Sequence, residues 1–176
     1  MGNYQLFDLK RGDMEKTGSG CFSTQLALFF YKGYRFSQNW SFSTILEMQY
    51  QINSAVTVKG FHAYGGGFGT DGKLLVGNAW RALANLQAFY GKPFSLSLDV
   101  LYEHYDGSIF YGHPGLNFFG RPCNTRQPSS ERVSLAPSIT YQFPSQVGVM
   151  VGSWLSICGR NAEQFIQYVA NVFYIF

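Results

Sequence analysis

The chain has 176 residues and a formal net charge of +3, and only 13% of its residues are charged, about half the share found in soluble globular domains. The small net charge argues against nucleic acid as a partner. No window approaches the roughly 18 consecutive apolar residues of a membrane-spanning helix. Because aromatic residues make up 18% of the chain, this composition favours a single β-rich domain that meets lipid through strands.

The first 20 residues show no signal peptide, because no basic stretch is followed by an apolar one. Myristoylation is excluded as well, since Leu6 stands where that signal requires Ser or Thr. We expect residues 1–20 to form an extracellular loop or N-terminal extension ahead of the first strand. An exported protein that begins in this way has either lost its signal or lacks an upstream stretch.

Apolar and polar residues alternate with a period of two in seven runs, which is the pattern of a strand with two different faces. In one run, for example, Val133, Leu135 and Ile139 alternate with polar residues. Each run exceeds the about 5–6 residues typical of soluble strands and reaches the about 9–11 that a tilted membrane strand needs. In chain order the runs are Cys21–Lys32, Trp40–Gln51, Ala79–Tyr90, Phe94–Glu103, Arg132–Phe143, Val147–Cys158 and Phe165–Phe176.

The connections between these runs alternate between short and long. Residues 34–40, 90–94 and 143–147 are short and flanked by aromatics, whereas residues 53–78 and 104–131 are long and rich in Gly. Short turns on one side and long loops on the other are typical of an outer-membrane barrel. The sequence therefore predicts an all-β, antiparallel transmembrane β-barrel in a Gram-negative outer membrane, with residues 21–176 as its strands.

Seven is an odd number of strands, whereas bacterial single-chain barrels have an even number. One resolution is an eighth strand at Ala55–Tyr64, although the run of three Gly beside it indicates a loop. The other, which we favour, is that further strands lie upstream of this chain. Within the predicted strand that holds it, Pro137 removes a ladder hydrogen bond, so we expect a local bulge there.

The last run ends on Phe176, with Val172 and Tyr174 at every second position before it. This ending resembles the C-terminal signal that outer-membrane barrels present to the barrel-assembly machinery. It places the final strand running from outside to inside, and the first strand likewise. A buried C-terminal strand of a soluble sandwich or barrel is the alternative interpretation.

Several stretches of the chain carry a resemblance: "TGSGCFSTQLALFF", "FSQNWSF", "GNAWRALANLQAFYGKPFSLSLDVLYE", "LAPSITYQFPSQVGVMVGSWLSICGRN" and the terminal aromatic strand. They resemble the C-terminal part of a family of Gram-negative outer-membrane proteins, the transporter-like barrels of the meta-pathway of phenol degradation type. The resemblance covers most of residues 17–176. It implies a larger barrel of about twelve strands and passage of small, often hydrophobic molecules, and it transfers no individual transport residue.

Ionisable residues gather on the polar sides of the predicted strands, where a barrel would point them into its lumen. As selective groups they would line a polar pore and choose the permeant. Alternatively, they form a structural salt-bridge network that fills a narrow barrel, since about eight strands leave room only for side chains. The predicted lumen-lining residues are Glu47, Arg81, Asp99, Glu103, Arg132 and Arg160.

The three cysteines, Cys21, Cys123 and Cys158, fall in the extracellular half of this topology. An odd count in an oxidising compartment leaves one unpaired, and we expect a Cys123–Cys158 disulfide that pins the long loop to the rim. The alternative is that all three are free. Their spacing fits no zinc site, so we expect no metal.

Three histidines are the candidates for a catalytic base. His104 with Ser108, and His113 in "YGHPGLN", are the only plausible pairings, while His62 lies in the other long loop. No nucleophile motif surrounds them, so we expect a chain without enzyme activity.

The long loop Asp106–Glu131 carries four aromatic residues and two arginines. It would constrict the pore or bind lipopolysaccharide phosphates through the arginines. A mobile surface loop is the alternative. The residues are Phe110, Tyr111, Phe118, Phe119, Arg121 and Arg126.

From these patterns we expect a passive, porin-like channel or transporter for small hydrophobic or aromatic molecules. Its expected partners are outer-membrane lipid, lipopolysaccharide and the barrel-assembly machinery, with no nucleic acid and no cofactor. Two alternatives remain open: a structural or adhesive outer-membrane barrel without transport, and a soluble lipocalin-like barrel that binds a ligand.

Overall fold

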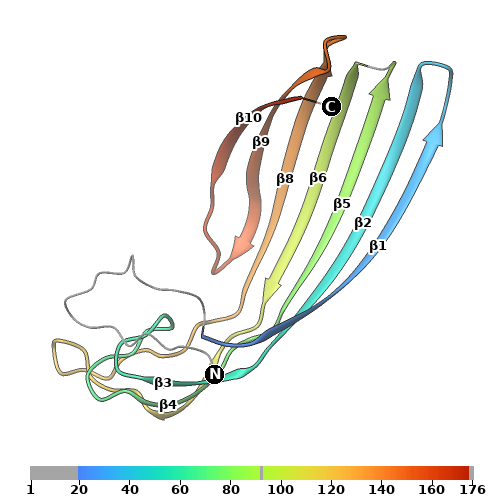
Figure 1. Ribbon diagram of the computed structural model, residues 1–176. Helices are drawn as coiled ribbons and strands as arrows, with labels where there is room; N and C mark the ends of the chain where they lie inside the picture. Colours follow the sequence, from blue (N-terminus) through green and yellow to red (C-terminus); the bar gives the residue numbers. More distant parts are fainter. Residues whose placement is uncertain (1–19, 92, 175–176) are drawn as a thin grey trace. The chain divides into compact units, whose positions relative to one another are not determined.

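The computed structural model describes residues 20–91 and 93–174, and in these residues the chain forms ten β-strands and no helix. The strands belong to two separate antiparallel sheets, one of seven strands and one of three (Figure 1). No helix in the described residues is long and apolar enough to cross a membrane. The all-β, antiparallel part of the predicted fold is therefore confirmed.

The seven-stranded sheet is built from the seven predicted runs, in chain order and with boundaries that differ by a few residues at most. Neighbouring strands run in opposite directions across the whole sheet (Figure 1). In order across the sheet its strands are β1 (Ser23–Arg35), β2 (Trp40–Asn53), β5 (Ala79–Tyr90), β6 (Phe94–Tyr105), β8 (Ser130–Gln142), β9 (Val147–Arg160) and β10 (Ile166–Tyr174).

The three-stranded sheet lies in the segments that the sequence assigned to long loops. It consists of β3 (Ala55–Lys59), β4 (Asp71–Leu75) and β7 (Ile109–His113), in that order. The eighth strand considered at Ala55–Tyr64 is thus a strand only as far as Lys59, and it pairs with β4 rather than with the large sheet. The loop Asp106–Glu131 is likewise not a plain surface loop, because β7 pairs with β4 along its whole length.

The described chain divides into two compact units. Unit 1 comprises residues 20–25, 51–79 and 105–129, with the three-stranded sheet; unit 2 comprises residues 26–50, 80–104 and 130–174, with most of the seven-stranded sheet. In unit 1 four apolar side chains form a buried cluster, as in a water-soluble domain: Val56, Val58, Leu74 and Phe110.

The seven-stranded sheet is open in the described residues, so its closure into a barrel with further strands stays a prediction. β1 and β10 are its two end strands and do not pair with each other. The expected extension at residues 1–20 lies almost entirely outside the described residues, as does Phe176 of the expected C-terminal signal.

One irregularity interrupts the pairing of β8 with β9. Val133 pairs with Cys158, whereas Ser134 pairs with Ser156, so Ile157 is an extra residue on β9. The register on both sides of Pro137 is continuous, with Leu135 opposite Leu155 and Ser138 opposite Gly152. The bulge is therefore at Ile157, and the prediction of a bulge at Pro137 is wrong.

Candidate functional site

The seven-stranded sheet has one face whose buried residues are polar, and we call it the polar face. Its most buried side chains are Ser43, Asn85, Glu103 and Ser134, which are only 1–8% exposed. They come from β2, β5, β6 and β8, at alternate positions that the sequence placed on one side. The opposite, apolar face is exposed: Leu46, Met48, Ile139 and Val151 are 46–57% exposed.

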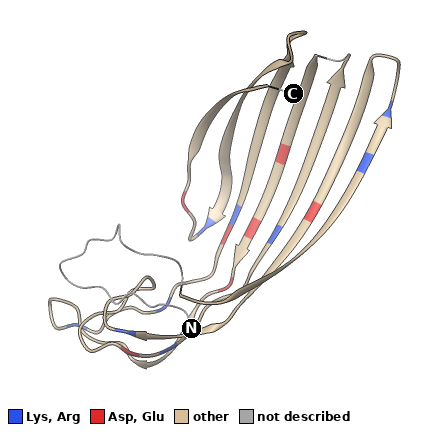
Figure 2. Cartoon of the chain, in the orientation of Figure 1, with Lys and Arg blue, Asp and Glu red and all other residues tan. Residues whose placement is uncertain are grey.

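This burial is the reverse of the usual arrangement in water, where apolar side chains fill the interior. Every buried side chain of unit 2 apart from glycine is polar or charged. Figure 2 shows that charged residues occupy only a few positions in the long strands. The polar face is therefore the natural candidate for the functional surface.

Three charged residues form an ionic cluster on this face. The Glu103 carboxylate on β6 lies between two guanidinium groups from the adjacent strands: Arg81 Nε on β5 lies 3.2 Å from Oε1, and Arg132 Nε on β8 donates to Oε2 at 3.1 Å. Arg132 Nη2 also contacts Oε2. Because Glu103 is buried, its charge is stabilised only by such close partners. The cluster of two cations and one anion carries a net positive charge.

The Arg132 side chain also connects the ionic cluster to aromatic residues. Its guanidinium group lies 5.1 Å from the centre of the Phe165 ring, within the range of a cation–π contact. The Phe165 ring packs edge-on against Trp154 at 5.2 Å, and the Phe165 N–H donates to Ser156 Oγ at 2.9 Å. The sequence did not single out Phe165 or Trp154, although Trp154 has the alternation expected for the polar face.

Neutral polar residues continue this face away from the ionic cluster. Ser43 Oγ donates to Gln87 Oε1 at 3.2 Å, and Asn85 Nδ2 donates to Ser97 Oγ at 3.0 Å and to Asp99 Oδ1. On β2, Glu47 accepts from the Gln49 amide. Two buried atoms, Asn85 Oδ1 and Ser134 Oγ, have no hydrogen-bond partner among the described residues. Buried polar atoms of this kind are stable when water reaches them.

Five of the six predicted lumen-lining residues have the alternation of the polar face, and Arg160 does not. The extra residue Ile157 reverses the alternation of β9, so Arg160 pairs with Glu131 and its Nε lies 3.4 Å from Glu131 Oε1. Glu131 is adjacent to Arg132 in the strand and therefore lies on the opposite face. The prediction that Arg160 shares a face with Arg132 is corrected by this bulge.

Arg160 instead belongs to a second cluster, on the apolar face. The Tyr102 hydroxyl donates to Glu131 Oε2 at 3.4 Å, and His104 Nδ1 lies 4.0 Å from the same oxygen. Trp80 packs against the Tyr102 ring at 4.6 Å. Aromatic and charged side chains mixed in this way are typical of the boundary between a membrane and water.

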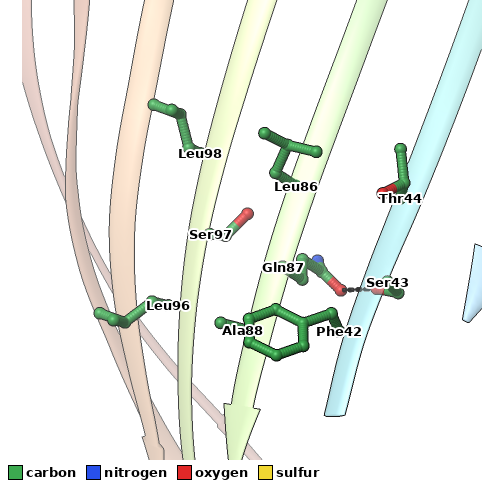
Figure 3. Close-up of a pocket in the computed structure, with 9 residues that line it drawn as sticks. All are labelled: Phe42, Ser43, Thr44, Leu86, Gln87, Ala88, Leu96, Ser97 and Leu98. Atoms are coloured by element: carbon green, nitrogen blue, oxygen red, sulfur yellow. Dashed lines mark hydrogen bonds between the residues drawn. The ribbon is translucent and has the colours of Figure 1, made fainter. Parts of the chain in front are cut away.

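An open hollow of about 380 Å³ lies in the same sheet (Figure 3). Six of its nine lining residues carry apolar-face alternation, and the other three, which include the hydrogen-bonded pair Ser43 and Gln87, carry polar-face alternation. The small side chains Thr44 and Ala88 make room between larger ones. The hollow is a surface depression and holds no cluster of reactive groups.

The expected Cys123–Cys158 disulfide is absent, and the described residues contain no disulfide at all. Cys123 lies in unit 1, where its Sγ occupies the space beside Gly67 that a larger residue would fill. Cys158 is exposed on β9 opposite Val133. The alternative in which no cysteine is bridged is the one that the structure has.

The remaining candidates are in unit 1 or at its boundary. His62 Nδ1 accepts from the Tyr64 N–H at 3.2 Å, and burial lowers the pKa of this imidazole below its ordinary 6.5. His113 Nδ1 accepts from the Gly115 N–H, and Ser108 Oγ accepts from the Gln127 N–H. No group of His, Cys, Asp and Glu in the described residues is arranged to hold a metal ion.

The arginines of the long loop lie at exposed positions. The Arg121 N–H donates to Asn117 Oδ1 and the Arg126 N–H donates to Asn124 Oδ1, so each residue has its backbone fixed by a neighbouring asparagine. Nearby, the Phe118 ring lies 5.9 Å from the Phe61 ring and 5.3 Å from the Phe68 ring, and these two rings lie 5.0 Å apart.

No family model, no curated protein and no solved structure matches the chain. Together, the fold and the site define an antiparallel all-β chain whose large sheet buries polar groups and exposes apolar ones.

Proposed function

We propose that unit 2 is a sector of a transmembrane β-barrel in a bacterial outer membrane, whose polar face lines a passive path for small molecules. One observation carries the proposal: the polar face is buried while the apolar face is exposed. In a bilayer the exposed face meets hydrocarbon and the polar face meets water. The strand lengths support the same assignment, since most of the seven strands exceed the about 9–11 residues of a tilted membrane strand.

The ionic cluster is the proposed selective element of this path. Arg81, Glu103 and Arg132 together leave one net positive charge at their level, and Arg81 keeps 44% of its side chain exposed. A cation presented at a water-filled passage attracts anions and repels cations. A structural salt bridge and a selective role are compatible here. Both carboxylate oxygens of Glu103 contact arginines, while the exposed part of the Arg81 side chain is accessible to a permeant.

The proposed barrel closes with additional strands. β1 and β10 run in the same direction, because they are the first and last of seven strands whose directions alternate (Figure 1). A ring closed by antiparallel pairs alone therefore requires an odd number of further strands between β10 and β1. Five such strands would give the twelve that the resemblance to the phenol-pathway transporters implies. Closure is required in lipid, where an unpaired strand edge is very costly.

The C-terminal strand fits the proposed recognition by the barrel-assembly machinery. Val172 and Tyr174 are 70% and 52% exposed on β10, with the alternation that a lipid-facing strand requires. Outer-membrane lipid and lipopolysaccharide are the further proposed partners.

A structural or adhesive barrel without transport is the second candidate. It is favoured by unit 1, which has its own apolar core. The Phe118 and Phe119 side chains of this unit are 72% and 87% exposed, so they are available to a partner. A soluble lipocalin-like barrel is disfavoured, because it would bury its apolar face around a ligand and expose its polar one.

The test is refolding of the chain in detergent, followed by electrophoresis with and without heating and by planar-bilayer conductance. We expect the chain to need detergent, and a compact form that shifts on heating would indicate a closed barrel. Conductance supports the channel, whereas a compact, heat-sensitive form without conductance supports the adhesive barrel. A monomer that is soluble without detergent contradicts the membrane assignment.

A further inference from the structure

A second hollow of about 720 Å³ lies at the end of unit 2 where β1 turns into β2. Its volume is in the range of about 300–1,000 Å³ that small-molecule sites occupy. It shares Phe42 and Ser43 with the hollow of Figure 3 and adds further aromatic and polar residues, Arg35 among them. The residues with polar-face alternation around it are Tyr31, Gly33, Arg35, Ser41, Ser43 and Phe89.

The polar part of this hollow consists of one cation and several neutral residues. Arg35 is the only charged residue among its described lining residues, and it takes part in no ion pair within the described chain. Ser37 Oγ accepts the Trp40 N–H at 3.1 Å and the Asn39 N–H at 3.3 Å, which leaves its own O–H free to donate. Since no lining residue is a carboxylate, the hollow favours an anion.

The aromatic part of the hollow is shaped by a glycine. A Cβ atom at Gly33 would lie 3.2 Å from Tyr31 Oη, so the Tyr31 ring extends along β1 across Gly33. Phe89 contributes a second ring from β5. Aromatic side chains accept flat apolar groups by stacking or edge-to-face packing.

The turn that borders the hollow is fixed by backbone hydrogen bonds. The N–H groups of Phe36 and Ser37 donate to the Trp40 carbonyl at 3.0 and 3.1 Å. The Gly91 N–H donates to the Asn39 carbonyl at 2.8 Å, which ties this turn to the one between β5 and β6. A site that is ordered before binding loses less entropy when a ligand enters.

We propose that this hollow binds a small planar carboxylate with an aromatic body. The Arg35 guanidinium offers the paired N–H donors that match a carboxylate, the Ser37 hydroxyl donates to a remaining lone pair, and Tyr31 and Phe89 pack on the ring. The inference deepens the proposed function, because it names a class of permeant for the polar face. Ligand binding is measured independently of passage through the channel, so the proposed site and the proposed channel can be contradicted separately.

The probe is 4-fluorobenzoate, observed by fluorine NMR relaxation with the full chain folded in detergent. Arg35→Gln is expected to weaken binding at least tenfold, and Arg35→Lys less, because the ammonium keeps the charge and loses the paired geometry. Lys32→Gln is the matched control. Lys32 lies on the same strand, at a position that alternation assigns to the apolar face, and its Nζ lies over the Tyr34 ring. Its replacement is expected to leave binding unchanged. 4-Fluorobenzyl alcohol is the uncharged control ligand.

Tyr31→Leu provides a second variant at an exposed position, 72% exposed, where folding is not at risk; we expect a several-fold loss. Equal affinity of parent and Arg35→Gln for the benzoate, or equal affinity of the parent for benzoate and alcohol, overturns the proposal. Binding without conductance leaves this site standing and removes the channel. Conductance without benzoate binding does the reverse.

Discussion

Unit 1 and unit 2 use the same strand alternation and bury opposite chemistry. In unit 1, Val56, Val58 and Leu74 alternate with exposed residues and pack into an apolar cluster. In unit 2 the buried side chains are Ser43, Asn85, Glu103 and Ser134. An alternation with a period of two shows only that the two faces of a strand have different environments. The comparison teaches that the surroundings of each sheet decide which face is inside.

The largest expected effect is at Glu103, whose loss removes the single anion between two arginines. We expect Glu103→Ala to lower the free energy of unfolding by about 3 kcal/mol, since breaking a buried ion pair leaves uncompensated charge. Urea unfolding in detergent measures it. Arg81→Ala in the Glu103→Ala background is the control, and it should recover part of the loss. An unchanged midpoint would mean that Glu103 does not hold the polar face together.

A comparable effect is expected at Leu74, which is fully buried in unit 1. Leu74→Ala should destabilise unit 1 by about 2–4 kcal/mol, because the truncation leaves a cavity in a packed core. Hydrogen exchange at β3, β4 and β7 reports it locally. Leu46→Ala, an exposed apolar site of unit 2, is the matched control and should change little in detergent. Equal losses at both leucines would erase the contrast between the two units.

Val151 tests the apolar face, where it pairs with Ile139 across β8 and β9. If this face meets lipid, Val151→Arg in lipid vesicles should cost about 2–4 kcal/mol, the range for a charge near the bilayer midplane. Thr140→Arg on the polar face is the control, with an expected cost below about 1 kcal/mol. Chemical unfolding from vesicles compares them. Equal and small costs would place water on both faces.

The smallest effect concerns pH and His62. Because burial lowers the pKa of His62 below 6.5, the unfolded chain takes up its proton first as the pH falls. The free energy of unfolding of unit 1 is therefore complete above pH 6.5 and decreases below it, until the folded pKa is passed. Hydrogen exchange of the Gly65 N–H, which donates to the His62 carbonyl, follows this decrease. His62→Gln should remove it.

The seven strands and the polar face were predictable because long alternating runs determine both strand and side. Ala79–Tyr90 was predicted at its observed bounds, and Glu103 and Arg132 were assigned to one face before their contact was known. The second sheet was missed because β3, β4 and β7 have five residues each, and Asp71 pairs with His113, a partner far along the chain.

Two site predictions failed for local reasons. Arg160 was assigned by counting alternate residues, and a single inserted residue, Ile157, reverses that count without any mark in composition. The Cys123–Cys158 bridge was inferred from topology, whereas a disulfide requires specific Cβ geometry that sequence does not contain. Phe165 lies just outside β10, where alternation gives no information on its contact with Arg132.

The pairing of β3 with β4 has a consequence for how fast the chain folds. The seven-stranded sheet has six pairs of neighbouring strands. Four of these pairs are joined by short connections, whereas β2 and β5 are separated by residues 54–78, and β6 and β8 by residues 106–129. Such distant pairs are slow to meet, because a long loop must close first. Ala55–Lys59 and Asp71–Leu75 both come from the first of these loops, and their pairing places Ala55 opposite Leu75. Once they pair, the loop between β2 and β5 is shortened, so formation of the small sheet should accelerate the pairing of these two strands.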